Sequence, residues 1–531
     1  MAASASATVA ADGPQQDHAS LFDWIAVLAG SLGALIASLD ISIVNSALPQ
    51  IQGEVGASGT EGTWISTGYL VSEVVIIPLT AWLTRVVGLR TLLLGCAVLF
   101  TGFSMVCGFS HGLSAMIIGR VGQGFTGGAL IPTAQTIIRT RLPTRQMPLG
   151  MTIFGLIVLL GPLIGPVMGG WLTENVSWQW CFFLNVPVAV ALVTLLLLGL
   201  PHEKAKPDLF FRADWLGIAG LTAFLSALTV VLEEGQRDRW LESDLIRWLS
   251  VLCVLGFTML LAAQATAKQP VIKLRLLLNM SYASVIIIVV TVGSGLYGIL
   301  YVLPQFLSGV SGYNAAQSGR VLFISGIPAF LMMPILPRLL GRVNIRLLVT
   351  GGLLCFAASC FLDIHLTPQD DGQSFFWSQL LRGVGQILAL MPLNQASVGA
   401  VSREDAADAA GLYNMARNLG GSLGLAALGI FIDRRTELHS DTIRETVNAN
   451  SPVVQERVSG MTASFLQSGT DPAYAQQQAL SQLSAQIHVQ ALVMTYSECF
   501  WLLGMALLAS LPLVLLLRRP PARQAAPAEG H

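Results

Sequence analysis

Charged residues are scarce in this chain of 531 residues, because Asp, Glu, Lys and Arg make up 11% while hydrophobic residues make up 53%. Soluble domains carry about 25% charged residues, so an ordinary soluble domain is excluded. The net charge of -1 and the lack of a basic tract interleaved with aromatic residues argue against nucleic acid as a partner. The sequence therefore predicts an all-α polytopic protein in a lipid bilayer.

Recognisable cysteine and phosphate-binding motifs are also lacking. The seven cysteines lie mostly in apolar stretches, and Cys355 and Cys360 are too far apart for a Cys-x-x-Cys pair, so we expect neither a metal site nor a disulfide framework. No Gly-x-x-x-x-Gly-Lys-Ser/Thr loop appears, and no connection is long enough for an ATP-binding domain. We expect no cofactor, which leaves an ion gradient as the energy source.

Fourteen apolar stretches follow a segment rich in Ala, Ser, Asp and Gln. This segment has no Lys or Arg ahead of an apolar core, so we expect residues 1–23 to be a disordered cytoplasmic tail, not a cleavable signal. Each stretch has about 19 to 28 residues, enough to cross a hydrocarbon core of roughly 30 Å. The predicted spans are 24–48, 63–84, 91–110, 113–138, 148–172, 180–200, 213–232, 246–266, 281–307, 317–338, 346–364, 374–397, 408–432 and 490–517.

Basic residues fall on alternate connections, whereas most of the intervening connections are acidic or neutral. The positive-inside rule therefore places both termini in the cytoplasm. The basic connections carry Arg85 and Arg90; Arg139, Arg141 and Arg145; Lys204, Lys206 and Arg212; Lys268, Lys273 and Arg275; Arg338, Arg342 and Arg346; Arg403; and Arg518, Arg519 and Arg523.

One external segment, residues 433–489, is polar and rich in Gln. Within it we expect residues 474–487 to form an amphipathic helix outside the membrane. Two interpretations remain open, a surface for a partner protein and a tolerated insertion.

Three charged residues lie inside the first, second and fourth predicted spans, namely Asp40, Glu73 and Arg120. A carboxylate in mid-span costs roughly 2.5 to 3.5 kcal/mol, so it normally faces water or a partner. At about 1.5 Å per residue from the external ends, Asp40 lies roughly 12 Å deep, Arg120 roughly 10 Å and Glu73 roughly 15 Å. Asp40 and Arg120 therefore meet if their helices are neighbours.

We predict a proton-coupling site made of Asp40, Glu73 and Arg120. Burial favours a protonated carboxyl and a nearby guanidinium favours a carboxylate, so movement of Arg120 would load and release a proton. The alternative for Asp40 is a permanent bridge that only holds helices together. For Glu73 it is a satisfied hydrogen bond between helices.

An internal repeat relates two halves of the chain. Arg120, Gly122, Gln123, Pro132 and Gln135 are echoed by Arg382, Gly385, Gln386, Pro392 and Gln395. We therefore predict two six-helix bundles, residues 24–200 and 281–517, related by an axis along the membrane normal. Residues 201–280 would supply two inserted spans, and residues 518–531 a cytoplasmic tail. Coincidence in Gly-rich helices is the alternative.

Several motifs resemble the major facilitator superfamily, and within it the fourteen-span drug/proton antiporters of bacterial inner membranes. The first span is close to that group's LDxTIVNVALP, and the fourth carries an RxxQG-like motif. The matching segments are Leu39-Asp40-Ile41-Ser42-Ile43-Val44-Asn45-Ser46-Ala47-Leu48-Pro49, Arg120-Val121-Gly122-Gln123-Gly124, Trp178-Gln179-Trp180-Cys181-Phe182-Phe183-Leu184-Asn185-Val186-Pro187 and Asn414-Met415-Ala416-Arg417-Asn418-Leu419-Gly420-Gly421-Ser422.

The fifth span is similar to the antiporter motif of this group. Its glycines repeat every four residues on one face, which favours close packing, and its prolines favour a bend that seals against a neighbour between the two halves. The alternative is plain helix packing. The predicted gating residues are Gly161, Pro162, Gly165, Pro166, Gly169 and Gly170.

The loop after the second span departs from the superfamily pattern, because Ala81 and Thr84 stand where Gly and often Asp are usual. The resemblance therefore carries over only Arg85, Gly88 and Arg90 as a cytoplasmic gate loop. Glu73 is not expected across the family and would mark a subgroup's own site.

A substrate cavity is predicted from aromatic and polar residues inside the spans. Tyr297 and Tyr301 lie one helical turn apart and Gln305 continues their face, so they would stack against a flat organic ligand, although aromatic stripes also serve packing. The predicted cavity residues are Asn45, Tyr69, Gln123, Tyr297, Tyr301, Gln305 and Arg417.

The resemblance implies a proton-coupled antiporter of the bacterial inner membrane that exports amphipathic organic compounds by alternating access. Its expected partners are a small-molecule substrate, protons and lipid, with a periplasmic adaptor protein and an outer-membrane channel as in some members. Exporters of a specific metabolite or siderophore and proton symporters share the same bulk features. An enzyme or membrane sensor is disfavoured, because no nucleophile-base motif or signalling domain is recognisable.

Overall fold

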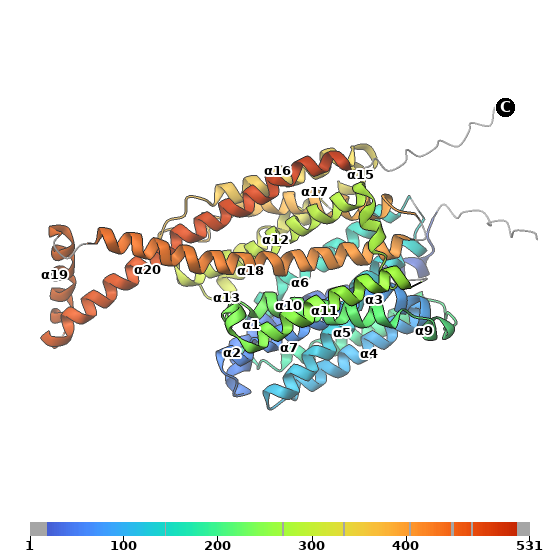
Figure 1. The fold of residues 1–531 in the computed structure, drawn as a ribbon, viewed down its shortest axis with the longest axis horizontal. Helices are drawn as coiled ribbons and strands as arrows, with labels where there is room; N and C mark the ends of the chain where they lie inside the picture. Colours follow the sequence, from blue (N-terminus) through green and yellow to red (C-terminus); the bar gives the residue numbers. More distant parts are fainter. Residues whose placement is uncertain are drawn as a thin grey trace, which may run out of the picture.

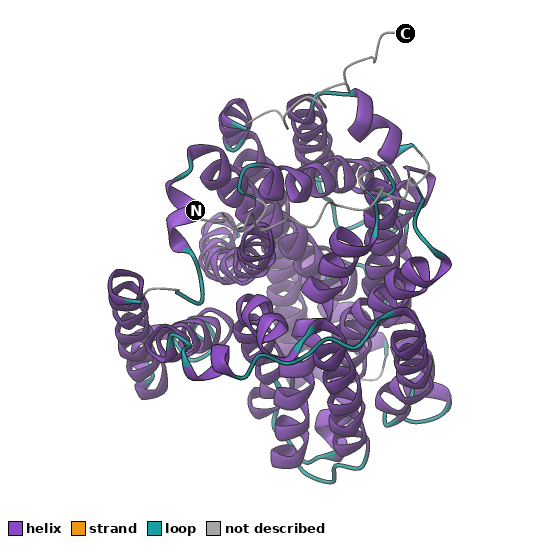
Figure 2. Cartoon of the chain, turned by 90° about the vertical axis from the view of Figure 1, so that its right-hand side faces the viewer, coloured by secondary structure: helices purple, strands orange, loops and turns teal. Residues whose placement is uncertain are grey.

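The computed structural model describes residues 18–143, 145–267, 270–332, 335–402, 405–447, 451–468 and 471–517. Most of the predicted N-terminal tail and the whole predicted C-terminal tail lie outside these ranges, and so do Lys268, Arg403, Arg518, Arg519 and Arg523. Throughout the described ranges the chain forms helices and loops without strands (Figure 2). The predicted all-α class is confirmed.

The first group of helices begins with α1, whose N-terminus is capped. Ser20 and Asp23 form a capping box, in which each side chain accepts a hydrogen bond from the other residue's backbone N–H. Helix α5 packs against α1, α3 and α4, and α1 packs against α6 and α8. The bounds are α1 (Leu21–Glu54), α2 (Gly59–Gly62), α3 (Trp64–Val87), α4 (Leu89–Gly108), α5 (Leu113–Arg141), α6 (Met147–Asn175), α7 (Trp180–Phe183) and α8 (Asn185–Gly199).

A hairpin of two long helices follows. Its helices α10 and α11 pack against each other, and α10 also contacts α3 and α18. The elements of this part are α9 (Asp208–Phe211), α10 (Trp215–Glu234), η1 (Trp240–Glu242), α11 (Asp244–Thr266) and η2 (Leu274–Leu278).

The second group of helices packs around α12. This helix contacts α17, α18 and α20, and α16 packs against α17 and α20. The bounds are α12 (Met280–Gly309), α13 (Ala315–Phe323), α14 (Gly326–Met332), α15 (Leu336–Arg342), α16 (Ile345–Leu362), α17 (Phe376–Gly399), α18 (Ala406–Thr446), α19 (Pro452–Gln467), α20 (Pro472–Ala509) and η4 (Leu511–Leu516).

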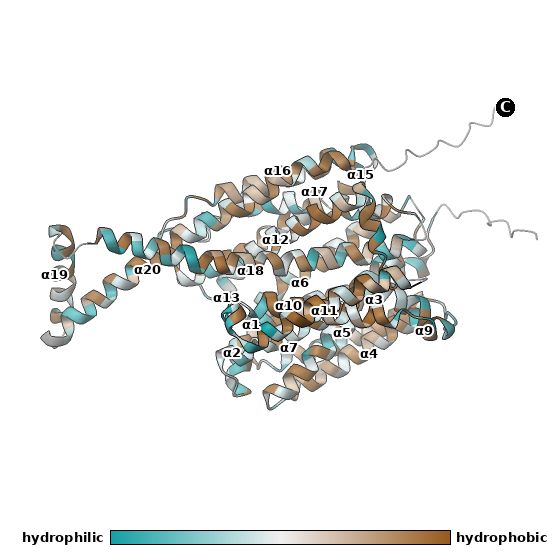
Figure 3. Cartoon of the chain, viewed as in Figure 1, coloured by the Kyte–Doolittle hydropathy of each residue, from teal (hydrophilic) through white to brown (hydrophobic). Residues whose placement is uncertain are grey.

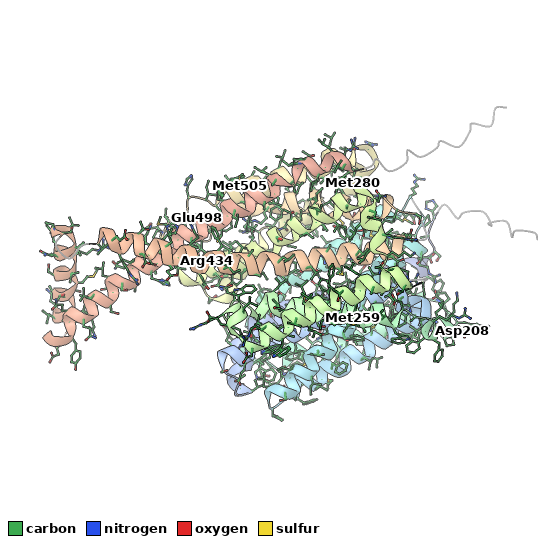
Figure 4. The ribbon with its side chains drawn as sticks, in the orientation of Figure 1. Asp208, Met259, Met280, Arg434, Glu498 and Met505 are labelled. Carbon is green, nitrogen blue, oxygen red and sulfur yellow. The ribbon has the colours of Figure 1, made fainter. Side chains whose placement is uncertain are left out.

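The long helices run roughly side by side, so the molecule has two ends (Figure 1). We call one end the termini face, because α1 begins and η4 ends there; Asp208 of α9 also lies at this end (Figure 4). The opposite end is the extension face, because α18 and α20 project beyond it and α19 lies at the tip (Figure 1).

All fourteen predicted spans coincide with helices, but not all of these helices are equally apolar. Within the described residues, 11 helices are long and apolar enough to cross a membrane, or up to 12 if the pair Gln317–Met332 and Leu336–Arg342, bent by 60°, is one span. The other two predicted spans match α5 and α17, whose apolar character is reduced by buried polar residues such as Arg120, Gln123 and Arg382. The count of fourteen stays a prediction.

The segment predicted as an external loop is helical almost throughout its described part. Helix α18 continues to Thr446, and α20 begins at Pro472 and runs without a break into the bundle. The stretch 474–487 is thus helical, as predicted, but it is the first part of a spanning helix instead of a separate one. Hydropathy falls where α18 and α20 leave the bundle (Figure 3), whereas their backbone hydrogen bonds continue, so this polar segment extends the two helices.

The two groups of helices meet along two seams. Helix α3 contacts α18 along one seam, and α6 contacts α13, α14 and α15 along the other. Each group has its own buried apolar core, one formed mostly by α1, α3, α4, α5 and α8 and the other by α12, α16, α17, α18 and α20. The seams are therefore the surfaces along which two separately packed groups contact each other.

Candidate functional site

Asp40 and Arg120 form a buried ion pair between α1 and α5, with side-chain exposures of 0% and 1%. The predicted meeting of these two residues is confirmed. The Arg120 guanidinium also donates from Nε to the carbonyl oxygen of Ile65, at 3.1 Å, and from Nη1 to Oε1 of Gln123, at 3.1 Å. The pair therefore ties α5 to both α1 and α3.

The second oxygen of Asp40 is also fully engaged. Oδ1 accepts hydrogen bonds from Nε2 of Gln123 and from Nδ2 of Asn185, each at 2.9 Å. Both amides donate in turn to the hydroxyl of Ser104, at 2.7 and 2.9 Å. This closed network fixes the Asp40 carboxylate within the first group and away from both seams.

Tyr69 and Gln123 belong to this network instead of lining a cavity. The Tyr69 ring lies 4.3 Å from the Arg120 guanidinium carbon, a cation–π contact, and its hydroxyl donates to the carbonyl of Ala37 at 3.3 Å. Both side chains have 0% exposure. Helices α1, α4 and α5 cover both side chains in this structure, and their role as substrate contacts stays a prediction.

Glu73 lies on α3 with an exposure of 3%. In the described part of the chain its carboxyl group has no hydrogen bond or ion pair, which contrasts with Asp40. The guanidinium groups of Arg417 and Arg120 lie within electrostatic range of it. Since Arg417 belongs to α18, Glu73 and Arg417 form a charge pair across the α3–α18 seam without direct contact.

Arg417 is also poorly satisfied. Its Nε is buried and has no hydrogen-bond partner among the described residues, and its Nη2 reaches only Oδ1 of Asn418, at 3.5 Å. Tyr297, on α12, lies within electrostatic range of Arg417 and Glu73, and its ring packs against Gly421 of α18. The structure thus brings Glu73, Tyr297 and Arg417 together in mid-helix.

Three predicted cavity residues lie nearer the extension face. Asn45 is exposed and accepts a hydrogen bond from Ser66 at 2.8 Å, which links α1 to α3. Tyr301 is 39% exposed, and Gln305 is exposed one turn further along α12. These residues follow the path from the Glu73 region to the extension face but do not join its charged cluster.

The repeat that relates Arg120 to Arg382 also holds in the structure. Arg382 forms an ion pair with Asp363 at 2.8 Å, and both side chains are buried. Its guanidinium carbon lies 5.8 Å from the ring of Phe500, as that of Arg120 lies over Tyr69. The partner differs, because Asp363 caps the end of α16 whereas Asp40 lies inside α1.

The glycine face of α6 packs closely, as predicted, but its partner is α1 of the same group. A Cβ on Gly165 would lie 2.5 Å from Cβ of Ser42, whereas a Cβ on Gly170 would meet nothing within 4 Å. Across the other seam, Pro166 is the residue that faces Gly319 of α13. The glycines therefore join α6 to α1, and only the proline side of α6 meets the second group.

The predicted gate loop joins the termini face. Gly88 has a φ of 84°, which a side chain would strain, and Arg90 donates to the carbonyl of Leu200 at 2.8 Å. Arg85 lies 3.8 Å from Asp408 at the start of α18. Of the three, only Arg85 links the two groups. A hydrogen bond of 3.1 Å between Gln135 of α5 and Asn414 of α18 also joins the groups.

Sequence reasoning missed several of these partners. Asn185 lies in the Trp178–Pro187 motif, two residues before Pro187 in an apolar run, and this position was a usable signal. Ser104, Asp363 and Asp408 carried no signal of their own, because serines are common in spans and the two aspartates lie at helix ends, where solvation is the default expectation.

Two surface hollows of the described residues lie away from these charges. One of about 680 Å³ is lined by residues of α4 including Thr91 and Val98, and one of about 560 Å³ is lined by α14 and α17 residues including Leu331 and Trp377. Both face outward and are mainly apolar, as expected where lipid covers a span. Neither overlaps the Glu73 region.

Residues 30–425 match the model of the Major Facilitator Superfamily. The chain is 32% identical to the colistin resistance protein EmrB of Acinetobacter baumannii, over 93% of this chain and 96% of that protein. It is 30% identical to the multidrug export protein EmrB of Escherichia coli K12, over 93% and 95%. The human organic anion transporter MFSD10 has a similar fold, with a TM-score of 0.56 at 16% identity over 91% and 99%.

Proposed function

Because the chain belongs to the major facilitator superfamily, and is thus a multi-pass membrane transporter and not an enzyme, we propose that it exports amphipathic organic compounds in exchange for protons. The similarity to multidrug export and colistin resistance proteins over more than nine-tenths of the chain supports a drug as the exported compound. The two groups of helices would rock about the central charges and expose them to each side in turn.

The observation that carries the proton coupling is the position of Glu73. It is buried, it lacks a hydrogen-bond partner among the described residues, and it faces Arg417 across a seam between the two groups. A carboxyl group placed in this way can bind a proton when the seam opens to one side and release it to the other. Asp40, in contrast, is held by three donated hydrogen bonds within one group, from Arg120, Gln123 and Asn185.

In the proposed cycle the Glu73 carboxyl binds a proton from the extension face and gives it up at the termini face. The attraction between a guanidinium and a carboxylate weakens as their separation grows. Any change in the separation of α3 and α18 therefore changes the proton affinity of Glu73. Tyr297 lies beside both charges and would contact the aromatic part of a substrate. Asp40 and Arg120 would keep α1, α3 and α5 in register.

We further propose that the termini face is cytoplasmic and that the membrane is the bacterial inner membrane. The basic residues Arg85, Arg90, Arg139 and Lys273 gather at the termini face, which agrees with the positive-inside rule. The extension formed by α18, α19 and α20 would then project into the periplasm, where an adaptor protein and an outer-membrane channel are the proposed partners. Its exposed apolar residues Val453, Leu466 and Leu480 support a protein contact.

The test is drug uptake into inverted vesicles, driven by an imposed proton gradient and followed with a panel of fluorescent dyes. We expect Glu73→Gln to lose the proton-dependent part of uptake, because an amide does not titrate. Glu174→Gln is the matched control, since Glu174 is exposed at the end of α6 and should retain full uptake. Proton-dependent uptake by Glu73→Gln equal to that of the wild type would remove Glu73 from the coupling mechanism.

The same assay separates the alternative functions. A proton symporter would accumulate its substrate with the proton gradient reversed, and an exporter of one metabolite or siderophore would leave every dye outside. Dye uptake that collapses when the proton gradient is dissipated supports the drug antiporter.

A further inference from the structure

The hairpin of α10 and α11 lies over the α3–α18 seam, with α10 in contact with both helices (Figure 1). It is therefore placed to act on the movement of the two groups. Its attachments to the two sides are unequal.

On the α3 side the attachment is strong at both ends of α10. Glu234, which is 2% exposed, accepts hydrogen bonds from the hydroxyls of Thr67, at 2.6 Å, and Thr63, at 3.2 Å. It also forms an ion pair with Arg237 at 2.9 Å, and Arg237 itself donates to Thr63.

At the termini face, the start of α10 is held to α3 by aromatic rings. Trp82 of α3 packs edge to face against Trp215 of α10, with ring centroids 6.2 Å apart, and stacks with Phe210 of α9 at 6.1 Å. Aromatic pairs of this kind are worth about 0.5 to 1.5 kcal/mol beyond their buried area. Both ends of α10 are thus attached to α3.

On the α18 side the attachment consists of two hydrogen bonds near the extension face. Glu233 accepts one from the Ser422 hydroxyl at 2.8 Å, and Gln236 donates one to Asp433 at 2.8 Å. The bond between Glu233 and Ser422 is partly buried, whereas the bond between Gln236 and Asp433 is exposed. Adjacent residues of one helix end, Glu233 and Glu234, therefore reach different groups.

We propose that the hairpin moves with α3 as part of the first group, and that the hydrogen bond between Glu233 and Ser422 is a releasable clasp that closes the extension face. Opening of that face separates α3 from α18 and breaks this bond, while the bonds of Glu234 to Thr63 and Thr67 persist. Glu233 is then a positioning residue that sets the balance between closed and open states. The inference rests on the rocking motion of the proposed function, but not on its substrate or its coupling ion.

The clasp is tested by distance measurements between pairs of spin labels in purified full-length protein. Labels at Gln50 (end of α1) and Ser308 (end of α12) report the opening of the extension face, because both positions are exposed at that face in different groups. A label at Glu242, in the hairpin turn, reports the hairpin. The background replaces Cys253 and Cys355, which are not fully buried.

We expect Ser422→Ala and Glu233→Ala each to raise the ratio of open to closed molecules about tenfold, the effect of losing one hydrogen bond to a charged acceptor. The double variant should give the same ratio as either single variant, because both remove the same bond. In every variant the distance from Glu242 to Gln50 should stay constant while that from Glu242 to Ser308 increases with opening.

Thr67→Val is the matched control, since it removes a hydrogen bond of the hairpin to α3 and leaves the clasp intact. It should not change the distance between Gln50 and Ser308. The proposal is overturned if Ser422→Ala leaves the populations unchanged, if the two single effects add, or if the hairpin label follows Ser308. Wild-type protein that opens as expected but transports no dye would instead count against the proposed function alone.

Discussion

At the scale of single residues, the buried carboxylates Asp40 and Glu73 differ in what surrounds them. Asp40 is paired with Arg120 and receives bonds from Gln123 and Asn185, whereas Glu73 faces the distant guanidinium of Arg417. When one member of a buried ion pair is removed, the remaining charge is left buried without compensation, and this destabilises the fold. The two residues should therefore respond to neutralisation in opposite ways.

Asp40→Asn should destabilise the fold by about 3 to 5 kcal/mol, because it leaves the Arg120 guanidinium buried without a counter-charge. Glu73→Gln should unfold at or above the wild-type temperature, because it removes a charge that has no direct partner. The measurement is the unfolding temperature of each purified variant in the same detergent. An Asp40→Asn variant as stable as the wild type would show that the network does not hold the first group together.

The contact of Asp40 with Arg120 was predictable from sequence because depth along a helix follows from counting residues. The surroundings of Glu73 were not, because counting does not give the rotation of α3. That rotation is set by packing: the Glu73 side chain lies over Gly128 of α5, where a Cβ would come within 3.0 Å of its Cγ. Tyr69, one turn earlier on α3, turns towards Arg120 instead of a cavity.

At the scale of whole elements, α6 has two sides with different partners. Its glycines at 161, 165 and 169 pack against α1, where Ser38 donates to the carbonyl of Val158 at 3.0 Å. On its other side, Pro166 faces Gly319 of α13, where a Cβ would lie 3.3 Å from Cβ of Pro166. Helix α6 is thus packed closely against its own group on one side. Its other side meets the second group, where the proposed movement would take place.

Gly165→Ala should destabilise the protein by about 1 to 3 kcal/mol, because the added methyl group would overlap Ser42. Gly170→Ala, on the same helix, should change stability by less than about 0.5 kcal/mol, because a Cβ there meets nothing within 4 Å. Thermal unfolding in detergent compares the two variants directly. Equal unfolding temperatures for the two variants would contradict the view that the contact with α1 decides the outcome, because both substitutions change helix propensity alike.

The helices of the bundle could be predicted from apolar stretches, but the extension could not. Residues 433–446 and 472–489 are polar, so hydropathy marks the membrane boundary and not the end of a helix. Arg435 and Glu498 form an ion pair between α18 and α20, and Thr436 donates to Thr495 at 3.2 Å. Arg434 and Glu498 lie where these two helices leave the bundle (Figure 4). Long-range pairs of this kind hold the two helices together, and no local pattern in the sequence reveals them.

At the scale of the whole molecule, polar links cross between the groups at both faces. The Lys273 ammonium lies 2.5 Å from Asp405 and 3.1 Å from Asp408, at the termini-face start of α18. The hydrogen bond from Lys273 holds the pKa of Asp405 below its usual range. Burial alone would lower the pKa of Lys273, but its hydrogen bonds to the two aspartates raise it overall.

These shifts predict that the link between Lys273 and Asp405 does not titrate in the working range of the transporter. The contribution of Asp405 to the free energy of unfolding is complete above its unfolded pKa of about 3.9, and it is lost as pH falls through the lower folded pKa. The contribution of Lys273 to the free energy of unfolding is complete below its unfolded pKa of about 10.4, and it is lost as pH rises through the raised folded pKa. Between about pH 5 and 9, Lys273→Met should therefore lower thermal stability by the same amount at every pH. A loss that varies across this range would contradict the assignment.

Arg139 connects the two groups directly at the termini face. From the end of α5 it donates to Oδ1 of Asn394 at 3.2 Å and to the carbonyl of Ala406 at 3.3 Å. Arg139→Met keeps the apolar stem and removes both bonds, so the termini face should open more often, by about tenfold for the loss of roughly 1.4 kcal/mol. The readout is a cysteine at Gly411, because a side chain there would contact Pro78 across the seam at 3.8 Å.

A membrane-impermeant thiol reagent added to inverted vesicles should label Gly411→Cys about ten times faster in the Arg139→Met background. Arg141→Met is the matched control, since Arg141 lies two residues further along α5 and has no hydrogen bond or ion pair in the described structure. Its labelling rate should equal that of the parent. Equal rates in both backgrounds would mean that the buried pair of Gln135 and Asn414 keeps the termini face closed without Arg139.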